Sequence, residues 1–404
     1  MAKTKLPNGW KHTKLRDIAR PIYERVGERK IETLSISAGI GFVNQAKKFG
    51  RELSGNQYTK YTVLRKGDFS FNKGNSKKYP YGCIYLLKDR EIASVPNAFY
   101  SFYIAGQCSE FYEQLFMSGC LNHQLGKFIN TGVRNDGLFN LYENDFYECT
   151  VPLPPFPEQR AIAEILITAD KIIDAKKRLV TAKQKQKRWL MQNLLTGKMR
   201  LPGFSGKWVE LSVGKLLTER NIQAPKNENY PLMAFIANIG ISPKGERYDR
   251  SALILDEENK FYKRTELGDF IYSSNNLQSG SIGLNTYGSA SISPVYSIFK
   301  PTEFAVSDFI GRFLTRKEFV DKMVKWRQGV IYGQWRIHEK DFLRMKINIP
   351  SLPEQQAIAK VLTTADREIE LLIKDLEQQK QTKKYLMQQL LTGKIRVKGV
   401  KNDD

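Results

Sequence analysis

One stretch of this sequence is written twice, and the repeat constrains the fold more than any other feature. Residues 154–201 align with residues 350–397 without a gap, and 22 of the 48 positions are identical. The copies begin with PPFPEQRAIAEILITAD and PSLPEQQAIAKVLTTAD, and they end with LLTGKMR and LLTGKIR. A chain of 404 residues is too long for one compact core, so the repeat implies two equivalent halves.

Both copies carry the pattern of a long helix with one apolar stripe. The stripe advances in alternating steps of four and three, which is the spacing of a coiled-coil seam. A proline precedes the first turn of each copy, and a glycine follows the last leucine, as helix ends prefer. Each helix should span about 39 residues and about 58 Å. The stripe positions are Ile162, Leu166, Ala169, Ile173, Lys176, Val180, Lys183, Lys187, Leu190 and Leu194, and then Ile358, Leu362, Ala365, Ile369, Leu372, Leu376, Gln379, Lys383, Leu386 and Leu390.

The two helices are expected to pair with each other as an antiparallel coiled coil. They share one apolar register, and pairing would bury both stripes. The alternative is two unrelated surface helices of similar sequence. Lys176, Lys183 and Lys187 interrupt the first stripe. Either their long stems reach solvent, or their polar layers fix the register of the pair.

The segments between the helices resemble each other more faintly. KGDFSFNKGN at residues 66–75 resembles LGDFIYSSNN at 267–276, and ENDFYECTVPLP resembles EKDFLRMKINIP. Short apolar runs such as Cys83–Leu87 and Lys346–Ile349 indicate strands between turn residues. The prediction is an α+β fold in which two globules, related by a pseudo-two-fold axis, are separated by the antiparallel helix pair. An antiparallel return of the second helix would also bring the chain termini close together.

The charge of the chain indicates a polyanionic partner. There are 64 basic and 42 acidic residues, giving a net charge of +22 and a pI near 9.6. A membrane surface or a solubility requirement could produce the same sign. Residues 1–157 carry +8 and residues 197–353 carry +7, whereas the first helix carries +5 and the second is neutral. Two basic globules with a fixed spacer suit a DNA duplex that is contacted at two separated places.

The compartment expected from the sequence is the cytoplasm. The four cysteines all lie in the first half and form no CxxC pair, which argues against a disulfide framework. The first residues lack the apolar core of a signal peptide, and no apolar run approaches the length that spans a bilayer.

Candidate DNA-reading loops stand at matching positions after the two GDF segments. Asn and Gln side chains can bond adenine at two points, and Arg or Lys can bond guanine. The plainer interpretation is a polar surface turn, because Asn, Gly and Ser form turns in any case. The candidates are Asn72, Lys73, Asn75, Lys77, Lys78 and Tyr79, then Asn130, Arg134 and Asn135, then Ser274, Asn275, Asn276 and Gln278, and lastly Arg327, Gln328, Tyr332, Gln334 and Arg336.

A search for catalytic motifs gives no strong candidate. The sequence lacks GxxxxGK[ST], and LLTGK has no upstream glycine, so it indicates a helix end. No Asn-Pro-Pro-aromatic or Asp-Pro-Pro-aromatic tetrad is present for base methylation. Cys120 and His123 have CxxH spacing, but no second pair completes a zinc site. We therefore expect a chain that is not an enzyme, with no catalytic residue and no metal site.

The doubled frame P-x-x-PEQ-x-AIA…LLTGK, with a different globule before each copy, resembles the specificity subunit of Type I restriction–modification systems. The likeness extends over essentially the whole chain. It implies target recognition domains at 1–153 and 199–349, spacer helices at 154–198 and 350–397, and a tail at 398–404. It further implies that each domain reads one half of a bipartite, asymmetric DNA target and that the helices set the spacing.

The same resemblance implies partner subunits that carry the chemistry. Two modification (methyltransferase) subunits would dock on the repeats, and restriction subunits would join for cleavage. S-adenosylmethionine, ATP and Mg²⁺ would then bind those partners, and this chain would hold no cofactor. The basic lysine run of the first helix is absent from the second, which leaves open whether the two docking surfaces are equal. The predicted docking residues are Pro157, Glu158, Gln159, Leu194, Leu195, Pro353, Glu354, Gln355, Leu390 and Leu391.

Two other functions remain open from the sequence. A self-contained DNA modification enzyme would methylate DNA without any partner. A nonspecific nucleic-acid-binding coiled-coil scaffold would show steep salt dependence but no preference among DNA sequences.

Overall fold

The computed structural model describes residues 6–50, 55–74, 79–129, 140–243, 260–331 and 334–397, with the backbone alone for residues 56, 329–331, 334 and 335. The chain forms two compact units. Unit 1 consists of residues 1–178 and 374–404, and unit 2 consists of residues 179–373. Each unit takes in part of both long helices.

The two long helices are those that the repeat predicts. α6 (Phe156–Leu194) and α11 (Leu352–Leu390) each have 39 residues. Each helix is followed by a glycine in the left-handed region, Gly197 with φ of 70° and Gly393 with φ of 72°. A side chain would strain that backbone, so glycine is the residue that the turn requires.

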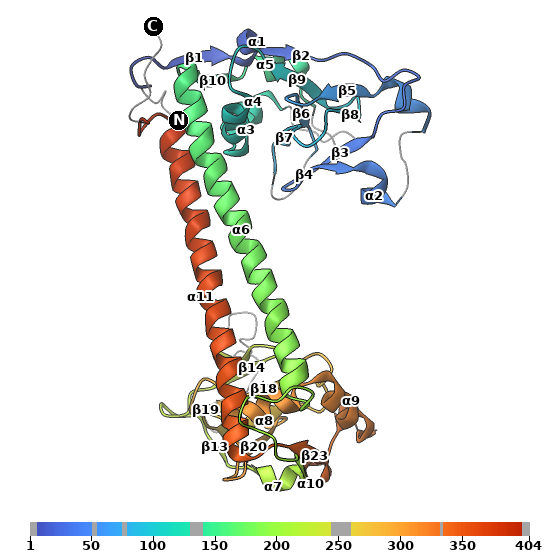
Figure 1. Ribbon diagram of the computed structural model, residues 1–404, viewed down its shortest axis with the longest axis vertical. Coiled ribbons are helices and arrows are strands. Elements are labelled where there is room, and N and C mark those ends of the chain that lie inside the picture. Colours follow the sequence, from blue (N-terminus) through green and yellow to red (C-terminus); the bar gives the residue numbers. More distant parts are fainter. Residues whose placement is uncertain are drawn as a thin grey trace. The chain divides into compact units, whose positions relative to one another are not determined.

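The helices lie side by side and antiparallel within each unit (Figure 1). In unit 1 the start of α6 shares a core with the end of α11, through Ile162, Leu166 and Leu390. In unit 2 the end of α6 shares a core with the start of α11, through Leu194 and Ile358. The predicted antiparallel seam is therefore confirmed.

The lysines of the seam are paired with acids of the facing helix. In unit 1, Lys176 pairs with Asp375. In unit 2, Lys183 contacts Glu368 at 2.7 Å, and Lys187 pairs with Asp366. Of the two roles left open for these lysines, reach to solvent or fixing of register, cross-helix pairing favours the second.

A fourth ion pair between the helices joins Lys383 of α11 to Asp170 of α6 in unit 1, and its lysine is more enclosed than the other three. Lys383 is 8% exposed, and its Nζ lies 2.6 Å from both carboxylate oxygens of Asp170. Gln114 of the globule donates a third hydrogen bond to that carboxylate at 3.1 Å. The pair thus ties both helices to the globule at one polar layer.

The globule of unit 1 is built on an antiparallel sheet in the order β2-β9-β6-β7. Its core includes Phe69 and Phe102, and Phe146 from α5 stacks on Phe71 with 5.0 Å between ring centroids. The strands are β1 (Lys11–Lys14), β2 (Ala19–Pro21), β3 (Leu34–Ser37), β4 (Gly41–Asn44), β5 (Thr62–Arg65), β6 (Phe69–Asn72), β7 (Cys83–Leu86), β8 (Ile92–Val95), β9 (Tyr100–Ile104) and β10 (Thr150–Leu153). The shorter helices are α1 (Leu15–Ile18), α2 (Gln45–Phe49), η1 (Gly55–Lys60), α3 (Ser109–Met117), α4 (Asn122–Phe128) and α5 (Glu143–Tyr147).

Unit 2 contains most of the same elements in the same chain order. Its sheet runs β12-β20-β17-β18. Phe342 of α10 packs 4.8 Å from Phe299, much as Phe146 packs 5.5 Å from Phe102 in unit 1. The strands are β11 (Val209–Ser212), β12 (Leu217–Glu219), β13 (Gln223–Ala224), β14 (Met233–Ile236), β15 (Gly240–Pro243), β16 (Tyr262–Thr265), β17 (Phe270–Tyr272), β18 (Ile282–Leu284), β19 (Ala290–Ile292), β20 (Ser297–Pro301), β21 (Gln328–Ile331), β22 (Gln334–Arg336) and β23 (Lys346–Ile349). The shorter helices are α7 (Val213–Leu216), α8 (Ser307–Leu314), α9 (Lys317–Lys325) and α10 (Glu339–Arg344).

The repeated GDF segment is a turn that leads into the central strand of each sheet. Asp68 accepts a hydrogen bond from the backbone N–H of Arg65 at 2.6 Å, and Asp269 accepts one from Glu266 at 2.7 Å. The glycine before each aspartate has positive φ. These residues therefore shape the strand entry, and the chain beyond the strand is left to carry the variable loops.

The predicted closeness of the chain ends is confirmed for the described residues. Arg396 Nη1 donates to the carbonyl oxygen of Asn8 at 2.9 Å, within unit 1. Residues 1–5 and 398–404, including the predicted tail, lie outside the described part of the chain.

The polar layer in unit 1 predicts a measurable stability effect. Replacing Asp170 with Asn should lower the free energy of unfolding by about 1–3 kcal/mol, because it leaves the enclosed Lys383 ammonium without its carboxylate. Urea unfolding followed by circular dichroism measures the change. The matched control is Asp174→Asn on the same helix, where the partner Lys177 is 54% exposed at its side chain, and the expected change is below about 0.5 kcal/mol. Equal losses in the two variants would contradict a special role for the enclosed pair.

Candidate nucleic-acid interface

Two of the predicted reading segments meet in unit 2. The loop at residues 273–280 follows β17, and the segment at 327–336 contains the β21–β22 hairpin. Arg327 Nη1 donates to Oε1 of Gln278 at 3.2 Å, and the backbone N–H of Ile337 donates to Ser274 Oγ at 3.1 Å. Segments about fifty residues apart in sequence thus form one polar surface.

Several of the predicted side chains on this surface are available to a ligand. Asn276, Gln278, Gln328 and Arg336 are exposed. Gln328 donates to Asp341 at 3.0 Å, so its amide is already oriented. Amide and guanidinium groups in this state can hydrogen-bond base edges or phosphates. The prediction of base contact by these residues stays a prediction.

The remaining candidates of unit 2 are less available. Ser274 and Asn275 are half-buried, and the backbone alone of Gln334 is described. The Oδ1 atom of Asn275 is buried and has no hydrogen-bond partner among the described residues. Tyr332 lies outside the described residues.

Arg327 has an unusual environment for a cation. It is half-buried, and burial lowers the pKa of its guanidinium. Its Nε and Nη2 atoms are withdrawn from solvent and have no hydrogen-bond partner in the described part of the chain. A guanidinium with an unsatisfied edge costs free energy, which a ligand with suitable acceptors would offset.

In unit 1 the predicted lysine at the equivalent loop is not a surface charge. Lys73 is 8% exposed, and its Nζ lies 4.2 Å from the centroid of the Tyr100 ring and 3.1 Å from the Tyr100 hydroxyl. Lys73 is therefore enclosed by its own globule, and its contact with DNA stays a prediction. The cation–π contact with Tyr100 holds the lysine inside.

The other candidates of unit 1 are placed in part. Asn72 is half-buried, and its side-chain oxygen accepts from the backbone N–H of Gly74 at 2.8 Å, so it shapes the turn. Tyr79 is half-buried beside Gly39. Asn75, Lys77, Lys78, Asn130, Arg134 and Asn135 lie outside the described residues.

The predicted docking residues turn out to form the joints between helices and globules. Glu158 is 2% exposed, and its carboxylate receives two hydrogen bonds from Arg396, at 2.6 and 2.7 Å. Glu354 is 1% exposed and receives the equivalent pair from Arg200, at 2.6 and 2.7 Å. In each unit, the arginine after one long helix thus forms a bidentate ion pair with the glutamate at the start of the other.

The glutamines of the PEQ motif tie each helix start to its globule. Gln159 accepts from the backbone N–H of Cys108 at 3.0 Å and donates to the carbonyl of Pro154 at 2.8 Å. Gln355 makes the same pattern with Val306 and Pro350, at 3.0 and 3.1 Å. The duplicated PEQ motif therefore has a structural reason to be identical in the two copies.

The burial of these groups corrects their predicted placement. A docking surface needs exposed side chains, but eight of the ten predicted residues are buried in their own unit, where they satisfy the joints. The buried residues are Glu158, Gln159, Leu194, Leu195, Glu354, Gln355, Leu390 and Leu391, whereas Pro157 is half-buried and Pro353 is exposed.

The sequence reasoning missed the arginines of the joints and the exposed residues beside them. Arg200 and Arg396 are identical in the two repeats, which is a signal that could have found them. Beside each joint an identical trio is exposed, Gln192, Thr196 and Lys198 in unit 2, and Gln388, Thr392 and Lys394 in unit 1. We refer to each trio as a repeat patch. Each threonine hydroxyl donates to the carbonyl of the glutamine one turn before it, at 2.6 Å.

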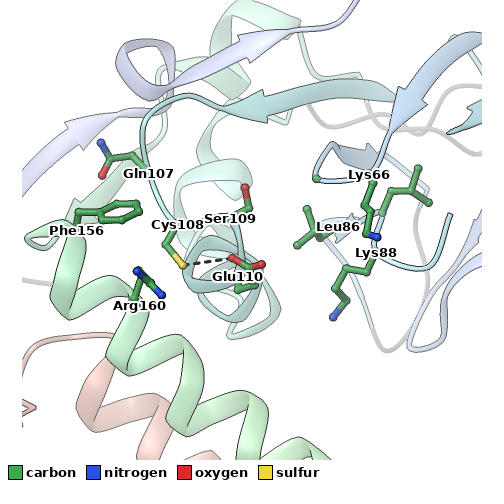
Figure 2. Close-up of a pocket in the computed structure, with 11 residues that line it drawn as sticks. Lys66, Leu86, Lys88, Gln107, Cys108, Ser109, Glu110, Phe156 and Arg160 are labelled. Atoms are coloured by element: carbon green, nitrogen blue, oxygen red, sulfur yellow. Dashed lines mark hydrogen bonds between the residues drawn. The ribbon is translucent and has the colours of Figure 1, made fainter. Parts of the chain in front are cut away.

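A pocket of about 470 Å³ lies where α6 begins in unit 1. Figure 2 shows Phe156 and Arg160 on the first turns of α6, facing the residues that start α3. Lys66 and Lys88 stand on the other wall, and they pair with Glu91 and Glu113, each at 2.8 Å. The pocket holds Cys108, but burial raises the pKa of that thiol, so it is not a ready nucleophile.

Two features of the described residues bear on metal binding and on thiol reactivity. No group of three or more His, Cys, Asp or Glu within them could hold a metal ion. Burial raises the pKa of Cys83 to about 11 and that of Cys149 to about 12, so neither is a thiolate near neutral pH. Within the same part of the chain, every helix is too short or too polar to cross a bilayer.

Comparison with known proteins finds one matching family model and several similar proteins. Residues 224–380 match the family model of the Type I restriction modification DNA specificity domain. The Type I restriction enzyme MjaVIII specificity subunit of Methanocaldococcus jannaschii is 28% identical over 302 residues, which are 68% of this chain and 68% of that protein. The crystal structure of the HsdS subunit from Thermoanaerobacter tengcongensis has a TM-score of 0.56 and 18% identity, with 98% of this chain and 99% of that chain covered. The S subunit from M. genitalium has a TM-score of 0.55 and 14% identity, covering 96% and 97%.

These findings show that the fold is that of the solved S subunits, with α+β domains and long helices. Residues 224–380 match the DNA specificity domain of type I restriction modification systems, and the chain is similar to specificity subunits of type I restriction enzymes.

Proposed function

We propose that this chain is the non-catalytic subunit that selects the DNA target of a type I restriction–modification complex. In this proposal the globule of each unit reads one half of a bipartite, asymmetric site in double-stranded DNA. The observation that carries the proposal is the polar surface of unit 2, where Gln278 and Arg327 meet from two separate segments. The net charge of +22 supports attraction to the phosphate backbone.

The chemistry of the complex would then reside in its partners. Two modification subunits would supply methyl transfer, and restriction subunits would join them for cleavage. S-adenosylmethionine, ATP and Mg²⁺ would bind those partners, and the chain would act in the cytoplasm, where it meets duplex DNA. The residues of this chain contribute positioning: they hold the DNA and the partners in a fixed relation.

We further propose that the repeat patches, with the residues around them, dock the two modification subunits. The patches are exposed, identical in sequence and fixed beside equivalent joints. Identical surfaces suit identical partners. The buried PEQ residues hold the joints beside these surfaces in place. This replaces the docking role first assigned to the buried residues.

The function is tested by mapping methylated bases across the genome of a host. Cells that carry this gene together with a modification subunit gene should methylate a motif of two short blocks separated by an unspecified gap. Cells with the modification subunit alone, or with this chain alone, should not. Methylation by this chain alone would favour the self-contained enzyme, and methylation without any motif would favour the nonspecific scaffold.

The spacer role predicts a change in the gap of that motif. Deleting seven residues from the middle of α6 and the seven that face them in α11 shortens each helix by about 10 Å and keeps the seam in register. At about 3.4 Å per base pair, the gap should shorten by up to three base pairs while both blocks persist. The methylated motif is read by sequencing, and an unchanged gap would refute the spacer role.

The docking proposal predicts the composition of the complex. Lys198→Glu or Lys394→Glu should each remove one modification subunit, because each reverses the charge of one repeat patch. The double variant should remove both subunits. Sedimentation measures the mass of the complex, and Lys185→Glu, an exposed lysine of α6 outside the patches, is the matched control. Two subunits still bound to the double variant would contradict this surface.

A further inference from the structure

A small pocket in unit 2 lies beside one of the two repeat patches. It has a volume of about 260 Å³, and Thr196 of the patch is among the residues that line it. Its walls come from the end of α6, the first residues of β11, the junction between α8 and α9, and β23. Sites for small molecules usually measure about 300–1,000 Å³, so this pocket is better suited to a single side chain of a partner.

Arg316, at the junction between α8 and α9, is a cation of this pocket without an acid partner. Its Nε atom donates to the carbonyl oxygen of Phe313 at 3.1 Å, and its guanidinium lies 4.0 Å from the centroid of the Phe313 ring. The described residues give its Nη1 and Nη2 atoms no hydrogen bond and no ion pair. Neither atom is among the enclosed polar atoms that lack a partner, so both remain accessible from the pocket. The guanidinium is thus held in place with two donors free.

The charges around Arg316 leave the pocket with an excess of positive charge. The lining contains the cations Arg316, Lys322 and Lys346 and the acids Glu210 and Glu318. Lys346 pairs with Glu210 at 3.4 Å. Burial lowers the pKa of the Arg316 guanidinium, and the charge of Glu318 opposes that effect as the weaker of the two causes. A carboxylate brought by a partner would therefore offset the cost of this half-buried charge.

The position of the pocket favours a protein partner over DNA. α9 begins directly after Arg316 and ends two residues before Arg327, which lies on the candidate DNA-reading surface. Its nine residues span about 14 Å at 1.5 Å per residue. The pocket and the reading surface therefore lie at opposite ends of α9, and the pocket instead adjoins the repeat patch through Thr196.

Unit 1 does not repeat these cations at the equivalent places. The helices α3 and α4 follow each other as α8 and α9 do, but residues 118–121 between them read SGCL and carry no charge. In the strand pair beside the long helices, Thr150 of β10 takes the place of Lys346 of β23. The two repeat patches are thus identical, whereas the surfaces next to them differ.

We propose that the pocket in unit 2 binds an acidic side chain of the modification subunit that docks on the adjacent repeat patch, with Arg316 as the group that recognises its carboxylate. This inference rests on the proposed function, because it names what the partner of one patch presents. Two carboxylate oxygens match the two free nitrogens of the guanidinium. Since unit 1 lacks a counterpart of Arg316, the contact strengthens docking at only one of the two sites.

The test uses the full chain and purified modification subunit, with one docking site removed at a time. On the docking proposal, Lys394→Glu leaves only the site of unit 2, and Lys198→Glu leaves only the site of unit 1. Adding Arg316→Gln to Lys394→Glu should weaken binding by about 10- to 100-fold, because a charge-assisted contact is lost. Adding it to Lys198→Glu should leave binding unchanged. Calorimetric titration measures each dissociation constant.

A second variant separates recognition from packing, because Arg316 also lies against Phe313. Asn348→Asp keeps the size of an exposed lining side chain that makes no hydrogen bond within the described residues. It adds a carboxylate to the pocket, so it should weaken the unit 2 site by repelling the incoming acid. Lys325→Gln, an exposed residue of α9 outside the lining, is the matched control and should bind as the unaltered chain does.

Three results would overturn the inference. The first is equal weakening of the two docking sites by Arg316→Gln, and the second is no weakening at either. The third is weakening by Arg316→Gln without any by Asn348→Asp, which would show that Arg316 acts by packing alone. If the unaltered chain binds no modification subunit at all, the proposed function fails instead, so the two failures are distinguishable.

Discussion

The ion pair between a buried glutamate at one helix start and an arginine beyond the other helix end is the contact on which each unit depends. In unit 1 it joins Glu158 to Arg396, and in unit 2 it joins Glu354 to Arg200. A carboxylate that is 2% exposed or less has lost its water, so it requires the bidentate partner. The globule, the start of one helix and the end of the other are therefore fixed as a single body.

The two joints are alike but not identical, and the difference lies in their tryptophans. Trp10 donates its indole N–H to Glu158 at 2.9 Å. In unit 2 the indole N–H of Trp208 has no partner among the described residues, and the ring lies under the Arg200 guanidinium at 6.0 Å. The carboxylate of unit 1 is thus held by one more donor, so the same motif tolerates different surroundings.

The helices were predictable from sequence because their signal is local and repeated. Apolar spacing, the helix-starting prolines and the terminal glycines each act within a few residues, and both copies of the repeat give the same answer. The ion pairs of the seam were not predictable in detail. Lys383 and Asp170 are 213 positions apart, and only the stagger of the antiparallel pair brings them together.

The candidate DNA-reading surface was less predictable from sequence than the helices. Asn, Gln and Arg in polar loops indicated candidates, and in unit 2 the structure brings Gln278 and Arg327 together. Polarity alone could not tell an exposed amide from an enclosed cation, however. Lys73 appeared to be a surface charge until its neighbour Tyr100, 27 residues later, was placed against it. The burial of a side chain depends on how the whole unit packs, so it cannot be predicted from the sequence of a single loop.

The contrast between joints and loops explains how one duplicated architecture can read two different sequences. The joint residues are identical in both repeats because each satisfies the same buried donors and acceptors, and a change in one partner would leave the other unpaired. The described residues of the loops after β6 and β17 make different contacts in the two units: Lys73 lies against Tyr100, whereas Gln278 accepts from Arg327. Asn72 and Lys73 can therefore face inward in one unit while Asn276 and Gln278 face outward in the other, without any change to the frame that holds them.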